Sequence, residues 1–425
     1  MGLVRGRGEG MKKSTLILFV LIAVFSAVTF VACNTDVVPV RSVTLTIDST
    51  HMKVGENKTL YATVRPADAA DTSVTWTSSD QSIATVDANG KVTAVSTGTA
   101  TITVTSNFDN TKKATCTVNV YDPFSTPLTL ELIEDGDFTL TIYKYETPNV
   151  YYSYNGGPLQ NAGASVLLQD CSAGDTIALY RTINEPVPPI TIRCSSDCYV
   201  YGNVMSLINK EDFEDLTEVP ELAFKSLFKY NDRIISHPEL DLVLPATKLA
   251  KNCYDSMFYG CPGLKRAPEL PATTLANDCY ANMFYLCSGL TKAPELPART
   301  LADHCYDSMF HSCSSLTKAP ELPATTLEEY CYNRMFDDCT ALKDSPLLPA
   351  EILVEGCYQE MFEGCKSLRS ITCLATDISA YCCTDCWVYN TTEVGTFYKN
   401  PNMNDWDTGS SKVPAGWKIV DYSAK

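Results

Sequence analysis

The stretch that decides the fold is residues 270–295, with the sequence LPATTLANDCYANMFYLCSGLTKAPE. Its pattern returns along the second half of the chain, and the Leu-Pro-Ala at its start recurs at a constant interval of 26 residues. The starting leucines are Leu244, Leu270, Leu296, Leu322 and Leu348. A fixed period of this length is typical of architectures that stack one structural unit on the next. The second half of the chain is therefore predicted to be a stack of repeats.

Each repeat has a core of the form Cys-Tyr-x-x-Met-Phe-x-x-Cys, whose apolar residues fall at positions i, i+1, i+4, i+5 and i+8. This spacing is typical of the apolar stripe on a short α-helix. The segment that follows, Leu290 to Ala293 in one unit, suits a short strand, and the next proline limits its length. One unit cannot bury its stripe alone, so we expect residues 208–389 to form an α/β solenoid with a parallel sheet on one face.

The ends of the repeat block depart from the pattern. Leu227 and Phe228 stand in the place of Met-Phe in a leading unit, and a degenerate trailing unit begins at Leu374. Atypical terminal units are expected to act as caps. Residues 390–425, which include Trp406 and Trp417, are predicted to form a C-terminal cap that closes the last open edge.

The Met-Phe-x-x-Cys-x-x-Leu signature resembles the BspA-type leucine-rich repeats of bacterial surface proteins. The resemblance covers about residues 208–425, half of the chain. It implies a leucine-rich-repeat solenoid that binds host matrix proteins or the surfaces of other cells.

Residues 42–121 alternate apolar and polar side chains in short runs, as at Val43, Leu45 and Ile47, with turn signals such as Asn89-Gly90 between them. Several such runs predict an Ig-like β-sandwich, with Trp76 in its core. Residues 74–104 resemble the bacterial Ig-like group 2 domain. That resemblance implies a spacer, and in some proteins an adhesive module.

Residues 122–207 are predicted to be a β-rich connector domain. Their tyrosine-rich segment, residues 143–157, favours cross-strand aromatic packing, with a sugar-stacking face as the alternative. Cys171, Cys194 and Cys198 also lie here. Three cysteines allow at most one internal disulfide, and the sequence leaves both Cys194–Cys198 and Cys171–Cys194 open.

The N-terminus carries a charged segment followed by an apolar run that ends at Ala32, directly before Cys33. A small residue before a cysteine resembles the lipobox of bacterial lipoproteins, which implies a signal peptide at residues 1–32 and lipidation of Cys33. The length of the run also allows a retained membrane anchor. We expect residues 33–41 to be a linker and the protein to be lipid-anchored in the cell envelope, exposed at the surface of the outer membrane.

The cysteines of the repeats recur with the period of the repeats, which argues against pairing. Two cysteines of one unit would lie two helical turns apart, too far for a disulfide. We therefore predict a structural core ladder of free thiols and no metal site, because the spacing does not suit zinc. The ladder comprises Cys253, Cys279, Cys305, Cys331, Cys357, Cys261, Cys287, Cys313, Cys339 and Cys365.

The charge balance limits the function classes. With 33 Lys and Arg against 50 Asp and Glu the formal net charge is −17, and such a surface repels nucleic acid. We find only 4 His and no P-loop, zincin, nucleophile-elbow or dinucleotide-binding motif. The chain is therefore predicted to have no catalytic residues and no cofactor.

Two exposed rows of side chains are candidates for binding. One is a charged row on the sheet side, read either as a self-neutralising stripe or as a recognition face. The other is the variable pair that follows Met-Phe, read either as aromatic contacts to protein or glycan or as surface drift. His304 and His311 occupy variable positions and are predicted to face solvent. The candidates are Arg266, Lys292, Lys318, Glu269, Glu295, Glu321, Tyr259 and Tyr285.

These observations predict a non-catalytic surface lipoprotein that binds host matrix or other cell-surface macromolecules through its repeats. The alternatives are a glycan-binding accessory lipoprotein of a nutrient-uptake system and a protein that is mainly a structural scaffold.

Overall fold

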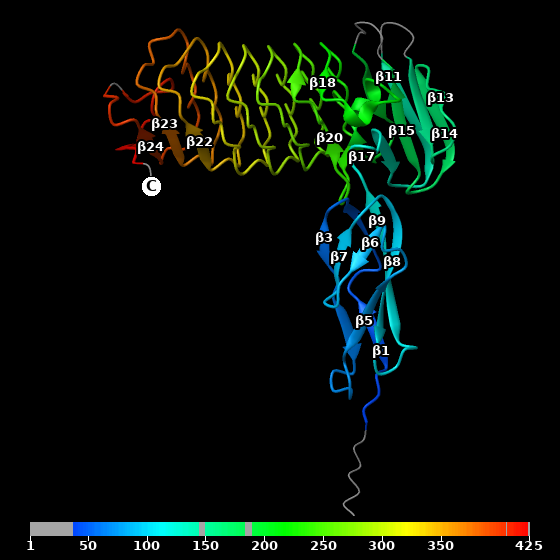
Figure 1. The fold of residues 1–425 in the computed structure, drawn as a ribbon. Coiled ribbons are helices and arrows are strands. Elements are labelled where there is room, and N and C mark those ends of the chain that lie inside the picture. The colour runs from blue at the N-terminus through cyan, green and yellow to red at the C-terminus, as the bar shows by residue number, and fades with distance from the viewer. Residues whose placement is uncertain (1–36, 144–148, 183–188, 405, 424–425) are drawn as a thin grey trace, which may run out of the picture.

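The structure is a computed structural model that describes residues 37–143, 149–182, 189–404 and 406–423. Figure 1 shows an N-terminal domain that stands as a stalk below a long stack of coils, with a β-rich domain at the corner where they meet. The helical elements in the described part of the chain are two short 3-10 turns, η1 (Val204–Leu207) and η2 (Phe213–Asp215). None of the described helices is long and apolar enough to cross a membrane. The predicted signal peptide and the lipidation residue Cys33 lie outside the described residues.

The N-terminal domain packs sheets of four, three and two strands around an apolar core, as predicted for a β-sandwich. In β8 buried side chains alternate with partly exposed ones, which is the pattern of a half-buried strand. Met52, Ile102 and Val118 are fully buried in the core, and Trp76 packs partly buried against it. The strands are β1 (Ser42–Leu45), β2 (Ser49–Lys53), β3 (Asn57–Thr59), β4 (Ala62–Arg65), β5 (Val74–Ser78), β6 (Ala84–Val86), β7 (Lys91–Ala94), β8 (Gly98–Ser106) and β9 (Lys113–Tyr121).

The connector domain is also built from β-sheets, and its last strand begins the stack of coils. Strand β17 pairs in parallel with β19 (Ile234–Ser236) and β20 (Leu242–Val243). One apolar core therefore continues from Leu128 in the connector to Trp417 near the C-terminus. The connector strands are β10 (Thr129–Leu132), β11 (Gly136–Tyr143), β12 (Val150–Tyr154), β13 (Gln160–Asn161), β14 (Ser165–Cys171), β15 (Thr176–Arg181), β16 (Thr191–Cys194) and β17 (Cys198–Asn203).

The predicted α/β leucine-rich-repeat solenoid is wrong, because the described repeats contain no α-helix. We call the observed structure of residues 218–421 the coil stack. Its regular elements are short parallel strands, and four of them form one sheet near the C-terminus. Its strands are β18 (Glu218–Val219), β19, β20, β21 (Lys248–Leu249), β22 (Asp344–Leu348), β23 (Ser370–Cys373), β24 (Thr396–Lys399) and β25 (Lys418–Asp421).

The segment predicted to be helical is a ribbon of consecutive turns. The Met257 N–H donates to the Tyr254 carbonyl within the coil (3.1 Å), whereas the Phe258 N–H donates to the Met283 carbonyl of the next coil (3.0 Å). Every fourth residue has a positive φ, as at Asn252 (55°) and Ser256 (57°), which a right-handed helix does not allow. Because this ribbon also repeats every four residues, it buries the same apolar spacing that a helical stripe would.

Equivalent aromatic rings stack from coil to coil in the core. Phe258, Phe284 and Phe310 lie nearly parallel, with centroids 5.6 Å apart at each step, and are fully buried. A second column of buried tyrosines, including Tyr280 and Tyr306 at 5.8 Å, runs beside it. Identical side chains at a fixed period therefore fill the interior continuously, which is the packing that the repeat requires.

The C-terminal end of the stack is closed by tryptophans. Trp387 ends both ring columns, stacks on Trp406 at 5.6 Å and donates from its indole nitrogen to the Lys412 carbonyl (2.6 Å). The Trp417 indole donates to the Thr392 carbonyl (2.8 Å). These contacts cover the last open coil with apolar rings, and the indole nitrogens of Trp387 and Trp417 are hydrogen-bonded.

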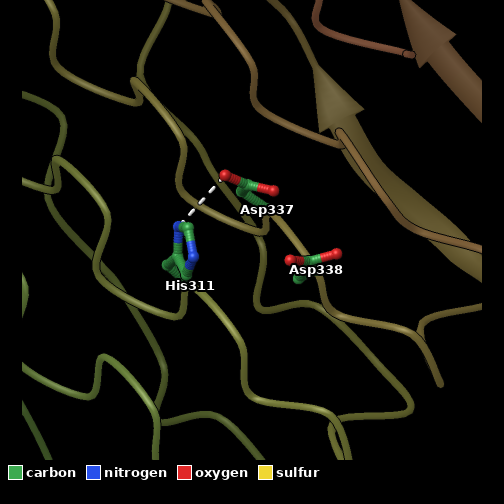
Figure 2. A group of neighbouring side chains, drawn as sticks. All are labelled: His311, Asp337 and Asp338. Atoms are coloured by element: carbon green, nitrogen blue, oxygen red, sulfur yellow. Dashed lines mark ion pairs between the residues drawn. The ribbon is translucent and has the colours of Figure 1, made fainter. Parts of the chain in front are cut away.

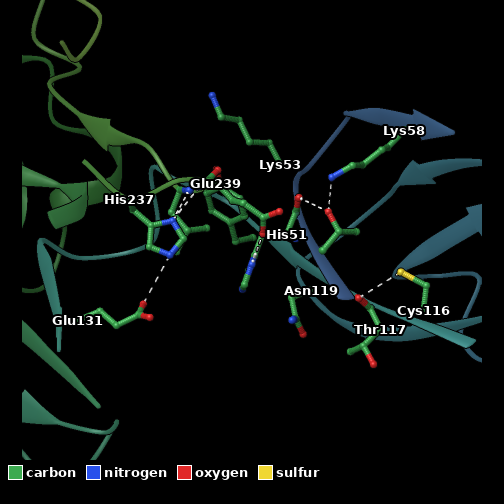
Figure 3. Close-up of polar contacts among 12 residues, drawn as sticks. His51, Lys53, Lys58, Cys116, Thr117, Asn119, Glu131, His237 and Glu239 are labelled. Atoms are coloured by element: carbon green, nitrogen blue, oxygen red, sulfur yellow. Dashed lines mark hydrogen bonds and ion pairs between the residues drawn. The ribbon is translucent and has the colours of Figure 1, made fainter. Parts of the chain in front are cut away.

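The stalk meets the coil stack through a few polar contacts between β2, β9 and the loop after β19 (Figure 3). The His51 ring nitrogen Nδ1 lies 2.9 Å from Glu239 Oε2, and the Tyr121 hydroxyl donates to the Glu239 carbonyl (3.3 Å). Behind this pair His237 is 6% exposed, and its Nδ1 accepts the backbone N–H groups of Glu239 (3.0 Å) and Leu240 (2.7 Å). The neutral His237 ring therefore fixes the loop that carries Glu239.

We predict that Phe284→Ala destabilises the chain by about 3–5 kcal/mol, because it opens a cavity in the middle of a fully buried ring column. Denaturant unfolding monitored by circular dichroism measures the change. The matched control, Leu286→Ala in the same coil, removes a side chain that is 41% exposed and should change the stability by less than about 0.5 kcal/mol. Equal losses in the two variants would contradict the packing described here.

The stability of the fold is predicted to depend on pH through His237. Burial, and then the neighbouring His51, lower the pKa of His237 from 6.5 to about 4. The unfolded chain therefore binds the proton first, so the stability that His237 contributes is complete above about pH 6.5 and is lost as the pH falls towards 4. In His237→Asn the amide oxygen can accept the same two N–H groups without titrating. Between pH 7 and 5 we expect the thermal midpoint of this variant to fall less than that of the unmodified chain. The midpoint of the control His304→Asn should fall as much as that of the unmodified chain.

Candidate functional site

One edge of the coil stack carries a column of side chains that changes from basic through aromatic to acidic. The column occupies the position directly after Met-Phe in each coil and includes both predicted tyrosines. We call it the edge column. Its members are Lys229, Tyr259, Tyr285, His311, Asp337 and Glu363.

The central rings of the edge column are stacked face to face. Tyr259 and Tyr285 lie 4.5 Å apart, and Tyr285 and His311 lie 4.2 Å apart, with nearly parallel planes. The Lys229 Nζ covers the outer face of Tyr259 at 4.6 Å from the ring centroid. Burial, and then the hydrogen bond with Tyr230, raise the pKa of Tyr259 to about 12. Because the faces of Tyr259 and Tyr285 are covered, these rings offer mainly edges and hydroxyls to a ligand.

A pocket of about 260 Å³ opens at the basic end of the edge column. We call it the basic pocket, and it is lined by Tyr143, Thr191, Arg193, Lys229 and Tyr230. The Arg193 guanidinium lies between two rings, 5.5 Å from the Tyr143 centroid and 6.0 Å from the Tyr230 centroid. Tyr143 and Tyr230 are about half exposed, so these rings, unlike Tyr259 and Tyr285, can contact a bound molecule. Two cations and two accessible rings thus meet on a chain whose net charge is −17.

The structure explains how the basic pocket is assembled. Arg193 and Thr191 stand on β16 of the connector, Tyr143 ends the neighbouring strand β11, and Lys229 and Tyr230 belong to the leading coil. The Thr191 hydroxyl donates to the Ser226 carbonyl (2.9 Å) and joins the two parts. Gly260 in the next coil leaves the room that the Tyr230 ring fills, since an added Cβ there would lie 2.8 Å from it.

The acidic end of the edge column contains a compact group of possible metal ligands (Figure 2). One ligand atom each from His311, Asp337 and Asp338 lies within 4.8 Å of the others. Only 16% of the His311 side chain is exposed, so the prediction that this histidine faces solvent is wrong. Burial, and then the charge of Asp337, raise the pKa of Glu363 at the next position of the column. Carboxylates therefore crowd this end of the stack.

The charged row on the sheet side lies where the sequence predicts, at the surface. Lys292, Lys318 and the three glutamates of the row are exposed, and Arg266 and Lys292 occupy paired positions of adjacent coils. Among the described residues no ion pair joins the members of this row to one another. Arg266 instead donates to the carbonyls of His237 (2.6 Å) and Leu240 (3.2 Å), so it serves the junction with the stalk. The glutamates are Glu269, Glu295 and Glu321.

All ten cysteines of the predicted ladder are fully buried free thiols. The second cysteine of each coil donates to a backbone carbonyl of the preceding coil, as from Cys287 Sγ to Phe258 O (3.1 Å). Burial raises the pKa of Cys287 to about 12, so the thiolate is disfavoured. In the connector the sulfurs of Cys194 and Cys198 lie 3.4 Å apart, and Cys171 is a separate buried thiol.

The basic pocket cannot be predicted from the sequence pattern. Tyr143 belongs to a tyrosine-rich segment, and nothing in the sequence pairs Arg193 with Lys229, which lies in another module. The only sequence signal for the pocket is Lys229, because a lysine stands where the next two coils carry Tyr259 and Tyr285.

Among the comparisons with known proteins, the family model matches the stalk. Residues 39–118 match the family model described as Bacterial Ig-like domain (group 2), which confirms the prediction for that segment. An uncharacterised protein of Clostridium acetobutylicum is 48% identical over 69 residues, 16% of this chain and 17% of its own length. The chain spans less than a fifth of the length of the first curated relatives that it matches. The predicted relation of the repeats to BspA-type proteins is not confirmed.

Two further relatives are glycoside hydrolases by name. The 3-O-alpha-D-galactosyl-alpha-L-arabinofuranosidase of Bifidobacterium longum subsp. longum is 48% identical over 16% of this chain and 6% of its own length. The lacto-N-biosidase of Bifidobacterium bifidum is 46% identical over 18% of this chain and 7% of its own length. A solved structure of domains 4 and 5 of the S-layer protein SbsC covers 38% of this chain and 96% of its own, at 16% identity and a TM-score of 0.17.

The cysteine environments predict a clear order of thiol reactivity. In the folded protein a maleimide should label the exposed Cys386, whereas the ten ladder cysteines should stay unlabelled until the chain unfolds. Peptide-resolved mass spectrometry with and without denaturant measures this order. Labelling of Cys287 in the folded state at the rate of Cys386 would contradict the buried ladder.

Proposed function

We propose that this chain is a non-catalytic cell-surface protein that binds acidic carbohydrate at the basic end of its coil stack. The observation that carries the proposal is the Arg193 guanidinium held between the rings of Tyr143 and Tyr230 beside Lys229. Aromatic rings pack against the apolar faces of sugars, and the two cations suit the carboxylate or sulfate groups of an acidic chain.

The charge of the rest of the molecule supports selectivity for an anion at this one place. A surface with an excess of 17 negative charges repels polyanions in general. A ligand that approaches the basic pocket therefore gains from two cations locally and is disfavoured elsewhere. This arrangement favours a single docking point over diffuse electrostatic binding.

The relatives of the stalk support a carbohydrate context. Two of them are glycoside hydrolases, and the shared region is the Ig-like domain rather than a catalytic part. In this proposal the Ig-like domain is a spacer that holds the coil stack away from a membrane to which Cys33 is lipid-anchored. The resemblance of the repeat motif to that of BspA-type surface proteins supports a place at the outer surface of the cell.

The test is binding of the full chain to an array of acidic and neutral polysaccharides, with heparin and a polyuronate as the acidic probes. We expect saturable binding to an acidic probe that weakens as salt is added. The double reversal Arg193→Glu with Lys229→Glu should weaken binding by more than about tenfold, because it replaces two attractive charges by two repulsive ones. No turnover of the probe should accompany binding.

The matched control is the double reversal Lys292→Glu with Lys318→Glu, which changes the net charge by the same amount on the sheet side. It should leave binding within about twofold of the unmodified chain if the basic pocket is the site. Loss of binding in the control alone would identify the charged row as the binding face and contradict the proposal. Binding to matrix proteins but to no polysaccharide would favour the adhesion alternative.

A further inference from the structure

The acidic end of the edge column has the geometry of a cation site. His311 and Asp337 hold the same position in adjacent coils, and Asp338 follows directly. The distance from His311 Nδ1 to Asp337 Oδ2 is 3.1 Å, and the ligand atoms of all three side chains lie within 4.8 Å of one another. Figure 2 shows the imidazole and both carboxylates from neighbouring coils gathered in one place.

One atom of this group is buried without a hydrogen-bond partner. The Asp337 side chain is 9% exposed, and among the described residues its charged partner is the His311 ring. The buried His311 Nδ1 has no hydrogen-bond partner in the described part of the chain, although Asp337 is near. A buried imidazole nitrogen without a hydrogen bond is costly unless a further group satisfies it.

The surrounding charges favour a cation at this place. Asp338 is exposed beside Asp337, and Glu363 occupies the next position of the column. The nearby Arg334 is already paired with Glu360, at 2.7 Å from its Nη2 to the carboxylate. Two carboxylates, Asp337 and Asp338, therefore lie beside the His311 ring, and its Nδ1 makes no hydrogen bond among the described residues.

The surroundings also position the ligands, and the exposed Asp338 leaves one side of the group open to solvent. The Tyr285 ring stacks on His311 at 4.2 Å and so sets the orientation of the imidazole. On the other side, Gly364 lies against Asp338, where an added Cβ would be 2.2 Å from Oδ1. The absence of a side chain at Gly364 gives the Asp338 carboxylate the room that it needs.

We propose that His311, Asp337 and Asp338 form a binding site for a divalent cation of the Mn²⁺ type. One imidazole and two carboxylates are a mixed nitrogen and oxygen ligand set, which suits Mn²⁺ better than thiolate-seeking ions. Water or a ligand group would complete the coordination on the open side. The bound ion joins adjacent coils, so it stabilises the folded stack as well as neutralising its acidic end.

The probe is Mn²⁺ alone, added to the full chain after treatment with a chelator. Mn²⁺ avoids the exposed Cys386, which would confuse titration with Zn²⁺. We expect one bound Mn²⁺ per chain in calorimetry and in the electron paramagnetic resonance signal of free Mn²⁺, and a rise in the thermal midpoint. His311→Asn, Asp337→Asn and Asp338→Asn should each weaken binding by more than about tenfold.

The matched control uses the second His–Asp pair of the stack. His304 Nδ1 lies 3.0 Å from Asp307 Oδ2, but this pair is not part of a three-ligand group among the described residues. His304→Asn should therefore leave Mn²⁺ binding unchanged. Absence of stoichiometric binding to the unmodified chain, or equal binding by the His304 and His311 variants, would overturn the proposal.

A readout without metal shows whether the variants fold. Asp337→Asn relieves repulsion between crowded carboxylates but also removes the partner of His311, so its metal-free thermal midpoint is measured beside that of the unmodified chain. If this variant unfolds, the exposed Asp338→Asn supplies the same test of binding. Carbohydrate binding at the basic pocket does not enter any of these measurements, so either proposal can fail without the other.

Discussion

The structure of the repeat half depends on one constraint, which is that the turn ribbon of each coil must hydrogen-bond that of the next coil at every second residue. The turn ribbon meets this constraint by alternating its N–H groups between its own coil and the following coil. Such alternation requires a positive φ at every fourth residue, and these positions hold residues such as Asn252, Ser256 and Gly260. The same geometry fixes the distance between coils and so brings equivalent phenylalanines into contact at 5.6 Å.

That spacing also creates the candidate sites. A side chain on the outer edge of one coil lies within stacking distance of its equivalents above and below, so the edge becomes a continuous column. Where neighbours are aromatic, their faces cover one another. Where the column meets the connector, Tyr143 and Tyr230 keep exposed surface, and Arg193 is held between them. At the acidic end of the column, the His311 imidazole and the Asp337 carboxylate of adjacent coils lie in contact.

The sequence predicted much of this organisation and failed at identifiable points. The Ig-like domain, the 26-residue period and the burial of the repeated cysteines follow from patterns that are visible residue by residue. The helix was predicted wrongly because Cys253, Tyr254, Met257 and Phe258 have the same spacing in a helix and in the turn ribbon. His311 was expected to face solvent because its position varies between repeats, but stacking on Tyr285 and contact with Asp337 bury it.

The sequence by itself determined that equivalent residues recur and that their apolar members must be buried together, because burial depends on side-chain chemistry and period. Only the tertiary structure decided which backbone achieves that burial, since two conformations with a near four-residue repeat present the same stripe. It also decided which polar residues meet. Arg193 and Lys229 come from different modules, and His311 and Asp337 from different coils, so their proximity is a property of stacking rather than of any local pattern.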